Sequence, residues 1–193
     1  MWSYGKGETF NLMIPNLYGG GSQTDLGRGS NIRKAVLDYT GNAMQADQIS
    51  AAAPTYWGDQ PFTSGPAYVG AIVVFLFILG AFIVKGSVKW WLLAATALSC
   101  LMAWGSNAMW FADFMIDHFP MYNKFRTPSS ALIVSSITMP VLAVLAVREW
   151  FRREKTDLTD KRRRLYFNIS LLLSAGECAF LVLLSNSVMP FSG

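Results

Sequence analysis

The chain has 193 residues, of which 52% are hydrophobic and only 15% are charged, and its formal net charge is +4. Soluble domains average about 25% charged residues, and here the charges gather in a few segments that leave long apolar runs free. Eight basic residues lie in 148–164, between two such runs. This placement is typical of a membrane protein and argues against nucleic-acid binding.

Four apolar segments predict the architecture. They cover residues 67–84, 88–107, 128–147 and 165–185. A helix needs about 20 residues to cross the hydrocarbon layer, and neighbouring helices can accommodate a proline such as Pro140. We therefore predict an all-α integral membrane protein, in which about four transmembrane helices form a bundle within residues 66–193.

Residues 1–65 are polar and rich in glycine, and they have no hydrophobic core of their own. Short helices are predicted after Ser30 or Asn31 and after Asn42, with Pro54 as a stop. We expect a mostly irregular and helical segment that packs on other extramembrane parts.

Residues 109–119 are too short and too charged to span a membrane. Asp113 and Asp117 are four residues apart and share one helix face, while Phe111, Phe114 and Met115 fall on another. The pattern predicts a helix that lies in the membrane interface and ends before Pro120.

Lysine and arginine counts predict the orientation. The turn 85–89 and the loop 148–164 are the most basic connections and are expected in the cytoplasm, whereas 1–65 and 105–127 balance their charges and are expected outside. Four spans alternate consistently with this assignment. The predicted location is a bacterial inner membrane.

This orientation places a polar N-terminal segment across the membrane, although residues 1–21 have no signal-peptide pattern. We expect an upstream span to carry it across, so that the chain is a piece of a larger membrane protein. The alternative is direct translocation of a weakly charged tail.

A cationic motif precedes the third span. Lys124 and Arg126 stand next to Thr127-Pro128, a good helix start whose free amides favour an anion. The motif predicts a phosphate site at the outer membrane surface. The alternatives are that the two cations anchor the helix to lipid headgroups or pair with Asp113 and Asp117.

Four carboxylates with aromatic neighbours and one indole are candidate contacts for a sugar or an acceptor. The carboxylates belong to Glu8, Asp59, Asp113 and Asp117, and the indole belongs to Trp57. Each also fits a solvated face or an interface anchor, and the spacing of Asp113 and Asp117 is too generic to indicate paired acid/base catalysis. The single histidine and the two cysteines, which lie in apolar runs, predict no metal site and no other cofactor, although a divalent metal is not ruled out.

Glu177 lies near the centre of the fourth predicted span, where a carboxylate is costly unless it is neutral or paired. No opposite charge lies at a similar depth in the four spans. A neutral, hydrogen-bonded glutamate on a small-residue face accounts for it.

Sequence motifs resemble a known family. The runs at 2–5, 14–16, 57–66, 89–94, 109–111 and 122–126 are similar to the YfhO family of large bacterial membrane proteins, in the form found in Bacteroidetes. This resemblance covers nearly the whole chain. Members of the family are similar to polytopic glycosyltransferases of the GT-C class, which transfer a sugar from a polyprenyl-phosphate donor to an acceptor outside the cytoplasm.

The resemblance implies that Tyr122, Asn123, Lys124 and Arg126 bind the donor phosphate. It also implies that the catalytic carboxylate precedes this chain, which by itself is then inactive. The expected partners are the bilayer, the lipid-linked sugar and the rest of the same polypeptide, with no nucleic acid. The alternative function is a non-catalytic transporter or a scaffold for envelope assembly, in which Glu177 and Pro140 matter more.

Overall fold

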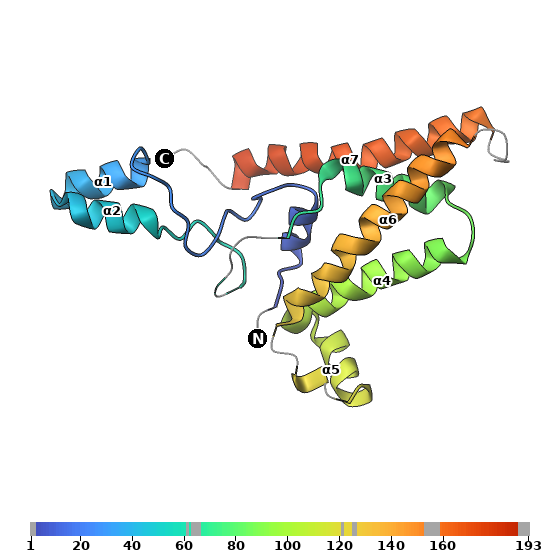
Figure 1. Ribbon diagram of the computed structural model, residues 1–193, viewed down its shortest axis with the longest axis horizontal. Coiled ribbons are helices and arrows are strands. Elements are labelled where there is room, and N and C mark those ends of the chain that lie inside the picture. The colour runs from blue at the N-terminus through green and yellow to red at the C-terminus, as the bar shows by residue number, and fades with distance from the viewer. Residues whose placement is uncertain are drawn as a thin grey trace. The chain divides into compact units, whose positions relative to one another are not determined.

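The computed structural model describes residues 3–60, 62, 67–120, 122–124, 127–152 and 159–188 (Figure 1). Every regular element in this part of the chain is a helix, which confirms the all-α fold class. The chain divides into two compact units. Unit 1 comprises Met1–Asn11, Pro15–Ala67 and Met102–Ser129, and unit 2 comprises Leu12–Ile14, Tyr68–Leu101 and Ser130–Gly193.

Unit 1 contains the short helices. These are η1 (Gly7–Leu12), α1 (Asn31–Thr40), α2 (Ala43–Ala51), η2 (Gly105–Ala108), α5 (Met109–His118) and η3 (Tyr122–Lys124). The predicted caps are confirmed, because Ser30 accepts a hydrogen bond from the Arg33 amide and Asn42 accepts from the amides after it. An ion pair of 2.5 Å between Arg33 Nε and Asp47 Oδ1 joins α1 to α2.

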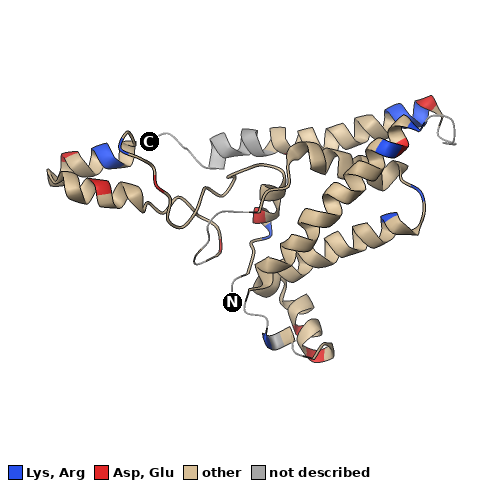
Figure 2. Ribbon diagram, viewed as in Figure 1, with Lys and Arg blue, Asp and Glu red and all other residues tan. Residues whose placement is uncertain are grey.

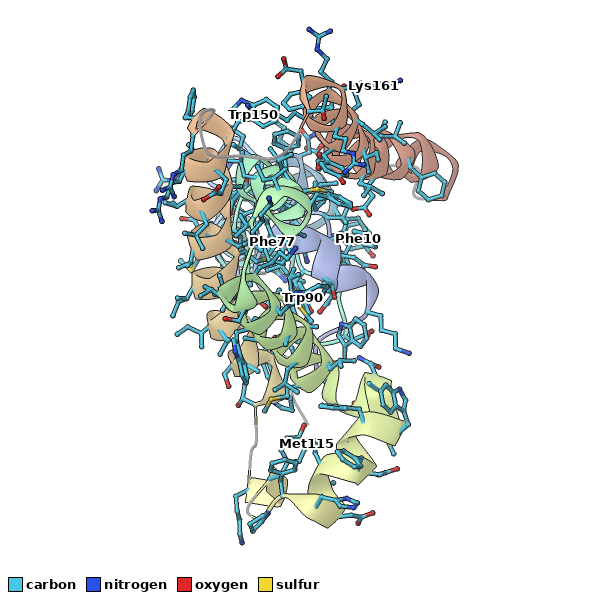
Figure 3. The ribbon with its side chains drawn as sticks, turned by 90° about the vertical axis from the view of Figure 1, so that its right-hand side faces the viewer. Phe10, Phe77, Trp90, Met115, Trp150 and Lys161 are labelled. Carbon is cyan, nitrogen blue, oxygen red and sulfur yellow. The ribbon has the colours of Figure 1, made fainter. Side chains whose placement is uncertain are left out.

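Helix α5 begins and ends within one residue of its predicted bounds, 109–119. It buries Phe111 and Met115, and Figure 3 labels Met115 within this helix. Phe114, by contrast, is half exposed and stacks on His118, whose Nδ1 lies 3.0 Å from the Phe114 carbonyl oxygen. The apolar residues of α5 therefore divide between a buried and an exposed side.

Unit 2 contains the long helices. These are α3 (Ala71–Ile83), most of α4 (Ser87–Trp104), the end of η4 (Pro128–Ala131), α6 (Leu132–Phe151) and α7 (Asp160–Val188). Two continuous helical stretches are long and apolar enough to cross a membrane by length and composition, Ser87–His118 and Pro128–Phe151. They contain the second and third predicted spans, 88–107 and 128–147, and the first stretch also includes the predicted interfacial helix. Helix α6 continues through Pro140.

The first predicted span, 67–84, begins too early. Helix α3 starts only at Ala71 and has 13 residues, which gives a length of about 20 Å. Gly70 has a φ of +116°, and the amides of Val69 and Gly70 both donate to the Leu12 carbonyl at 3.0 Å. These residues are thus tied to the segment 12–14 and cannot extend the helix.

The predicted loop 148–164 is also too long. Helix α6 runs to Phe151 and α7 begins at Asp160, so the arginines at 162–164 are helical. The Thr159 carbonyl accepts hydrogen bonds from the amides of Arg162 and Arg163, and Asp160 in the first turn suits the positive end of the helix dipole. In the part of the chain that the structure describes, α7 is not among the candidate spans, so four spans are not supported.

The core of unit 2 lies between α3 and α6. It consists of Leu79, Ile83, Val84, Leu142 and Ala146. Phe77 and Trp150, both labelled in Figure 3, are among the partly buried residues packed against it. Gly80 permits the close approach, because a Cβ there would lie 2.9 Å from the Leu142 carbonyl oxygen and 3.2 Å from the Ala146 Cβ.

Hydroxyl groups join α4 to α6. Thr96 and Thr138 have hydroxyl oxygens 2.7 Å apart, and Ser99 hydrogen-bonds Ser135. From the first pair to the second, the residue number rises by three along α4 and falls by three along α6. The two helices are therefore antiparallel. Small hydroxyl residues of this kind allow close packing and hydrogen bonding between membrane helices.

The contact at Gly80 yields a stability prediction. Gly80→Ala is expected to destabilise the protein by about 1–3 kcal/mol, because the added methyl group meets the backbone of α6. The control is Gly176→Ala on α7, where an added Cβ has no neighbour within 4 Å. Thermal unfolding in detergent compares the two variants, and an equal effect of both would contradict the close packing of α3 on α6.

Candidate functional site

The N-terminal segment of unit 1 is held by the end of α4 and by η2. The Tyr4 amide donates to the Ala103 carbonyl at 2.8 Å, and the Trp104 indole donates to the Thr9 hydroxyl at 2.9 Å. Ser106 donates to the Ser3 hydroxyl from its amide and from its side chain. Polar contacts of the backbone and of small side chains thus bring residues about a hundred positions apart together.

Glu8 stands in η1 and is only 1% exposed. Its Oε2 accepts a hydrogen bond of 2.9 Å from the Gly5 amide. Its Oε1 accepts from the Asp59 amide at 2.9 Å and from the Tyr56 hydroxyl. The buried carboxylate is therefore satisfied by three donors, two of them from a turn about fifty residues away.

The turn at 56–59 closes tightly around this carboxylate. A Cβ at Gly58 would lie 1.4 Å from the Glu8 Oε1, so only glycine fits there. The Tyr56 hydroxyl also accepts a hydrogen bond of 3.1 Å from the Gln60 amide. Hydrogen bonds with Glu8 and with Gln60 thus hold the Tyr56 hydroxyl, and they fix the position of the turn relative to Glu8.

Asp59, unlike Glu8, has an exposed carboxylate. Its Oδ2 lies 3.3 Å from the Asn107 amide nitrogen, which also donates to the Tyr4 carbonyl at 3.0 Å. Trp57, next to it in the turn, is 59% exposed. An exposed carboxylate and an exposed aromatic ring are therefore available to a ligand, while the Glu8 carboxylate is buried.

Two tyrosines border the carboxylates. Burial and the hydrogen bond to Glu8 raise the pKa of Tyr56. Burial, with the charges of Glu8 and Asp59, raises the pKa of Tyr18. Both phenols therefore keep their protons at neutral pH and remain hydrogen-bond donors.

Asn11 lies one turn of η1 after Glu8, on the same face of this 3₁₀ helix, and is fully buried. Its Oδ1 accepts a hydrogen bond of 3.3 Å from the Tyr18 amide. Within the described ranges its Nδ2 has no hydrogen-bond partner. One buried donor in this polar cluster is thus left without an acceptor.

The predicted phosphate motif is described only in part. Tyr122 is buried, which raises its pKa, and Lys124 is exposed. Arg126 and the side chain of Asn123 lie outside the described residues. Pro128 is the first residue of its helical stretch, as predicted, and it lies beside Gly105, where a Cβ would meet Pro128 Cγ at 3.1 Å.

Gly105 also connects this helix start to the N-terminal segment. Its φ of +46° is one that glycine adopts readily, and a Cβ there would lie 2.6 Å from the Ser3 hydroxyl. Unit 1 thus contains Glu8, Asp59 and the start of the Pro128–Phe151 stretch. The structure brings Glu8, Trp57 and Asp59 together.

Asp113 and Asp117 are exposed on α5, and no hydrogen bond within the described part of the chain joins either of them to Glu8 or Asp59. Three further residues of the cluster, Tyr18, Tyr56 and Asn107, were not predicted from the sequence. Tyr56 had a signal, because it adjoins the Trp57-Gly58-Asp59 turn. Among the described residues no group of three or more His, Cys, Asp or Glu side chains could hold a metal ion.

The hydrogen bonds of Glu8 yield a second prediction. Tyr56→Phe is expected to lower the free energy of unfolding by about 1–3 kcal/mol, because a buried carboxylate loses one donor and the Gln60 amide loses its acceptor. Tyr39→Phe is the control, since Tyr39 is 92% exposed on α1. Thermal unfolding measures both, and a silent Tyr56→Phe would show that the Glu8 cluster does not stabilise unit 1.

Comparison of the chain with protein-family models, with curated proteins and with solved structures finds no match.

Proposed function

We propose that this protein is a multi-pass membrane protein that transfers a sugar from a polyprenyl-phosphate donor to an acceptor of the cell envelope, as its resemblance to the YfhO family implies. The observation that carries the proposal is the cluster in which Glu8 holds Asp59 beside Asn107 and Trp57. Carboxylate and amide groups bind sugar hydroxyls, and an exposed indole offers an apolar face to a sugar ring.

The surface of unit 2 supports a membrane location. Helix α6 exposes four apolar side chains at spacings of four, four and three residues, which places them on one face. They are Ile133, Ile137, Val141 and Val144. Water does not favour such a continuous apolar stripe, whereas lipid does. The hydrogen-bonded hydroxyls between α4 and α6 also support a membrane location, because such pairs join helices within membranes.

In the proposed orientation, residues 1–65 and 105–127 face outward and the basic segments 85–89 and 148–164 face the cytoplasm. Lys124 and Arg126 then hold the donor phosphate, with Tyr122 and Asn123 beside them. Asp59, Asn107 and Trp57 contact the sugar or the acceptor. Glu8 has its carboxylate occupied by three donors, so its role is to position Asp59.

The assay for this proposal is release of a labelled sugar from a polyprenyl-phosphate donor by membranes that contain the intact protein. Asp59→Asn is expected to lower the rate about tenfold to a hundredfold, since a charged hydrogen bond to the sugar is lost. Arg126→Ala is expected to abolish transfer. Both variants should insert into the membrane at wild-type levels.

Asp38→Asn is the control for Asp59→Asn, because it removes an equal charge from the exposed side of α1. It is expected to transfer sugar at the wild-type rate. A wild-type rate for both Asp59→Asn and Arg126→Ala would overturn the proposed role of unit 1.

The second candidate function is a non-catalytic transporter or an envelope-assembly scaffold. Glu177 favours it, because this carboxylate is exposed on α7 among apolar residues. Glu177→Gln is expected to be silent in the sugar-release assay, since a hydrogen-bonding side chain of the same size is kept. A strong loss of activity in this variant would assign function to α7 instead of the Asp59 cluster.

A further inference from the structure

One end of unit 2 is strongly basic. Four helix ends meet there: the end of α3, the start of α4, the end of α6 and the start of α7. Figure 2 shows lysine and arginine gathered where α6 ends and where α4 and α7 begin. The basic residues of this end are Lys85, Lys89, Arg148, Arg152, Lys161, Arg162, Arg163 and Arg164. Among the described residues only Glu149 and Asp160 oppose them.

The internal contacts of unit 2 assemble this end. The antiparallel pairing of α4 with α6 through Thr96 and Thr138 places the start of α4 level with the end of α6. Phe82 of α3 stacks on Tyr166 of α7, with ring centroids 5.4 Å apart. The ends of all four helices are therefore neighbours for reasons that do not depend on their charges.

Arg163 is a cation that contributes to the fold. It is buried, it donates a hydrogen bond to the Trp150 carbonyl, and its guanidinium lies 4.8 Å from the centre of the Trp150 ring. This contact joins the end of α6 to the start of α7. The side chains before and after it, Arg162 and Arg164, are exposed.

Exposed aromatic residues border the basic end. Trp90, Trp91 and Phe151 are each more than 65% exposed. The Lys89 ammonium lies 5.1 Å from the centre of the Trp90 ring, so a cation lies against an indole at the start of α4. Such pairs are typical of the boundary between lipid headgroups and hydrocarbon.

We propose that this basic end binds anionic phospholipid headgroups. The charge is complementary to phosphate, and the apolar stripe of α6 continues directly from it through Val144 to Phe151. A nucleic acid or an acidic soluble protein would cover the cations and leave this stripe and the tryptophans in water. A leaflet that contains anionic lipid satisfies the cations, the indoles and the apolar stripe together.

The test uses the intact protein in nanodiscs of phosphatidylcholine alone or of phosphatidylcholine mixed with phosphatidylglycerol. The expected result is a higher unfolding midpoint with phosphatidylglycerol, and a difference that shrinks as salt is added. Arg162→Gln with Arg164→Gln is expected to remove most of this difference. Arg163 is left in place, so the contact with Trp150 is kept.

Two further double variants keep the test decisive. Arg28→Gln with Lys34→Gln removes two exposed cations from unit 1 and is expected to retain the lipid effect. Arg162→Lys with Arg164→Lys keeps the charge and should also retain it, even if the glutamine variant folds poorly. The proposal is overturned if the native protein shows no difference between the two lipids, or if the lysine variant loses that difference.

Discussion

The buried carboxylate of Glu8 is the interaction on which the candidate site depends. A carboxylate that is 1% exposed is tolerated only when hydrogen-bond donors surround it, and here those donors are the Gly5 amide, the Asp59 amide and the Tyr56 hydroxyl. Two of the three belong to a turn that is distant in sequence. Satisfying Glu8 therefore fixes the turn, and fixing the turn presents Asp59 and Trp57 at the surface of unit 1.

Polar contacts also hold the N-terminal segment in place. The end of α4 supplies the Ala103 carbonyl and the Trp104 indole, and η2 supplies Asn107; each binds a backbone or hydroxyl group of the N-terminal segment. Hydrogen bonds are directional, so they set the position of this segment more sharply than apolar packing alone would. An arrangement of this kind suits a site whose side chains must keep fixed distances.

Local signals in the sequence predicted much of the fold. Ser30 and Asn42 cap the helices that follow them, Pro120 follows the end of α5, and apolar runs mark α4 and α6. The predicted start of α3 was wrong because a tertiary contact decides that boundary. The amides of Val69 and Gly70 bind Leu12, and the chain before α3 is therefore not helical. The sequence singled out Glu8 and Asp59 separately, but their meeting depends on a contact across 51 residues that no local pattern encodes.

Unit 2 combines two features that suit lipid better than water. Hydroxyl side chains of α4 and α6 face each other, where Thr96 pairs with Thr138 and Ser99 with Ser135, while the apolar stripe of α6 faces outward. In water this arrangement would expose the stripe and bury hydroxyls that gain little from leaving the solvent. In lipid the same hydroxyls have no better partners than each other, and the stripe has no reason to be buried. Because one face of α6 carries the hydroxyls that meet α4 and another carries the stripe, a rotation of α6 about its axis would lose the hydroxyl pairs and turn the apolar stripe away from the outside.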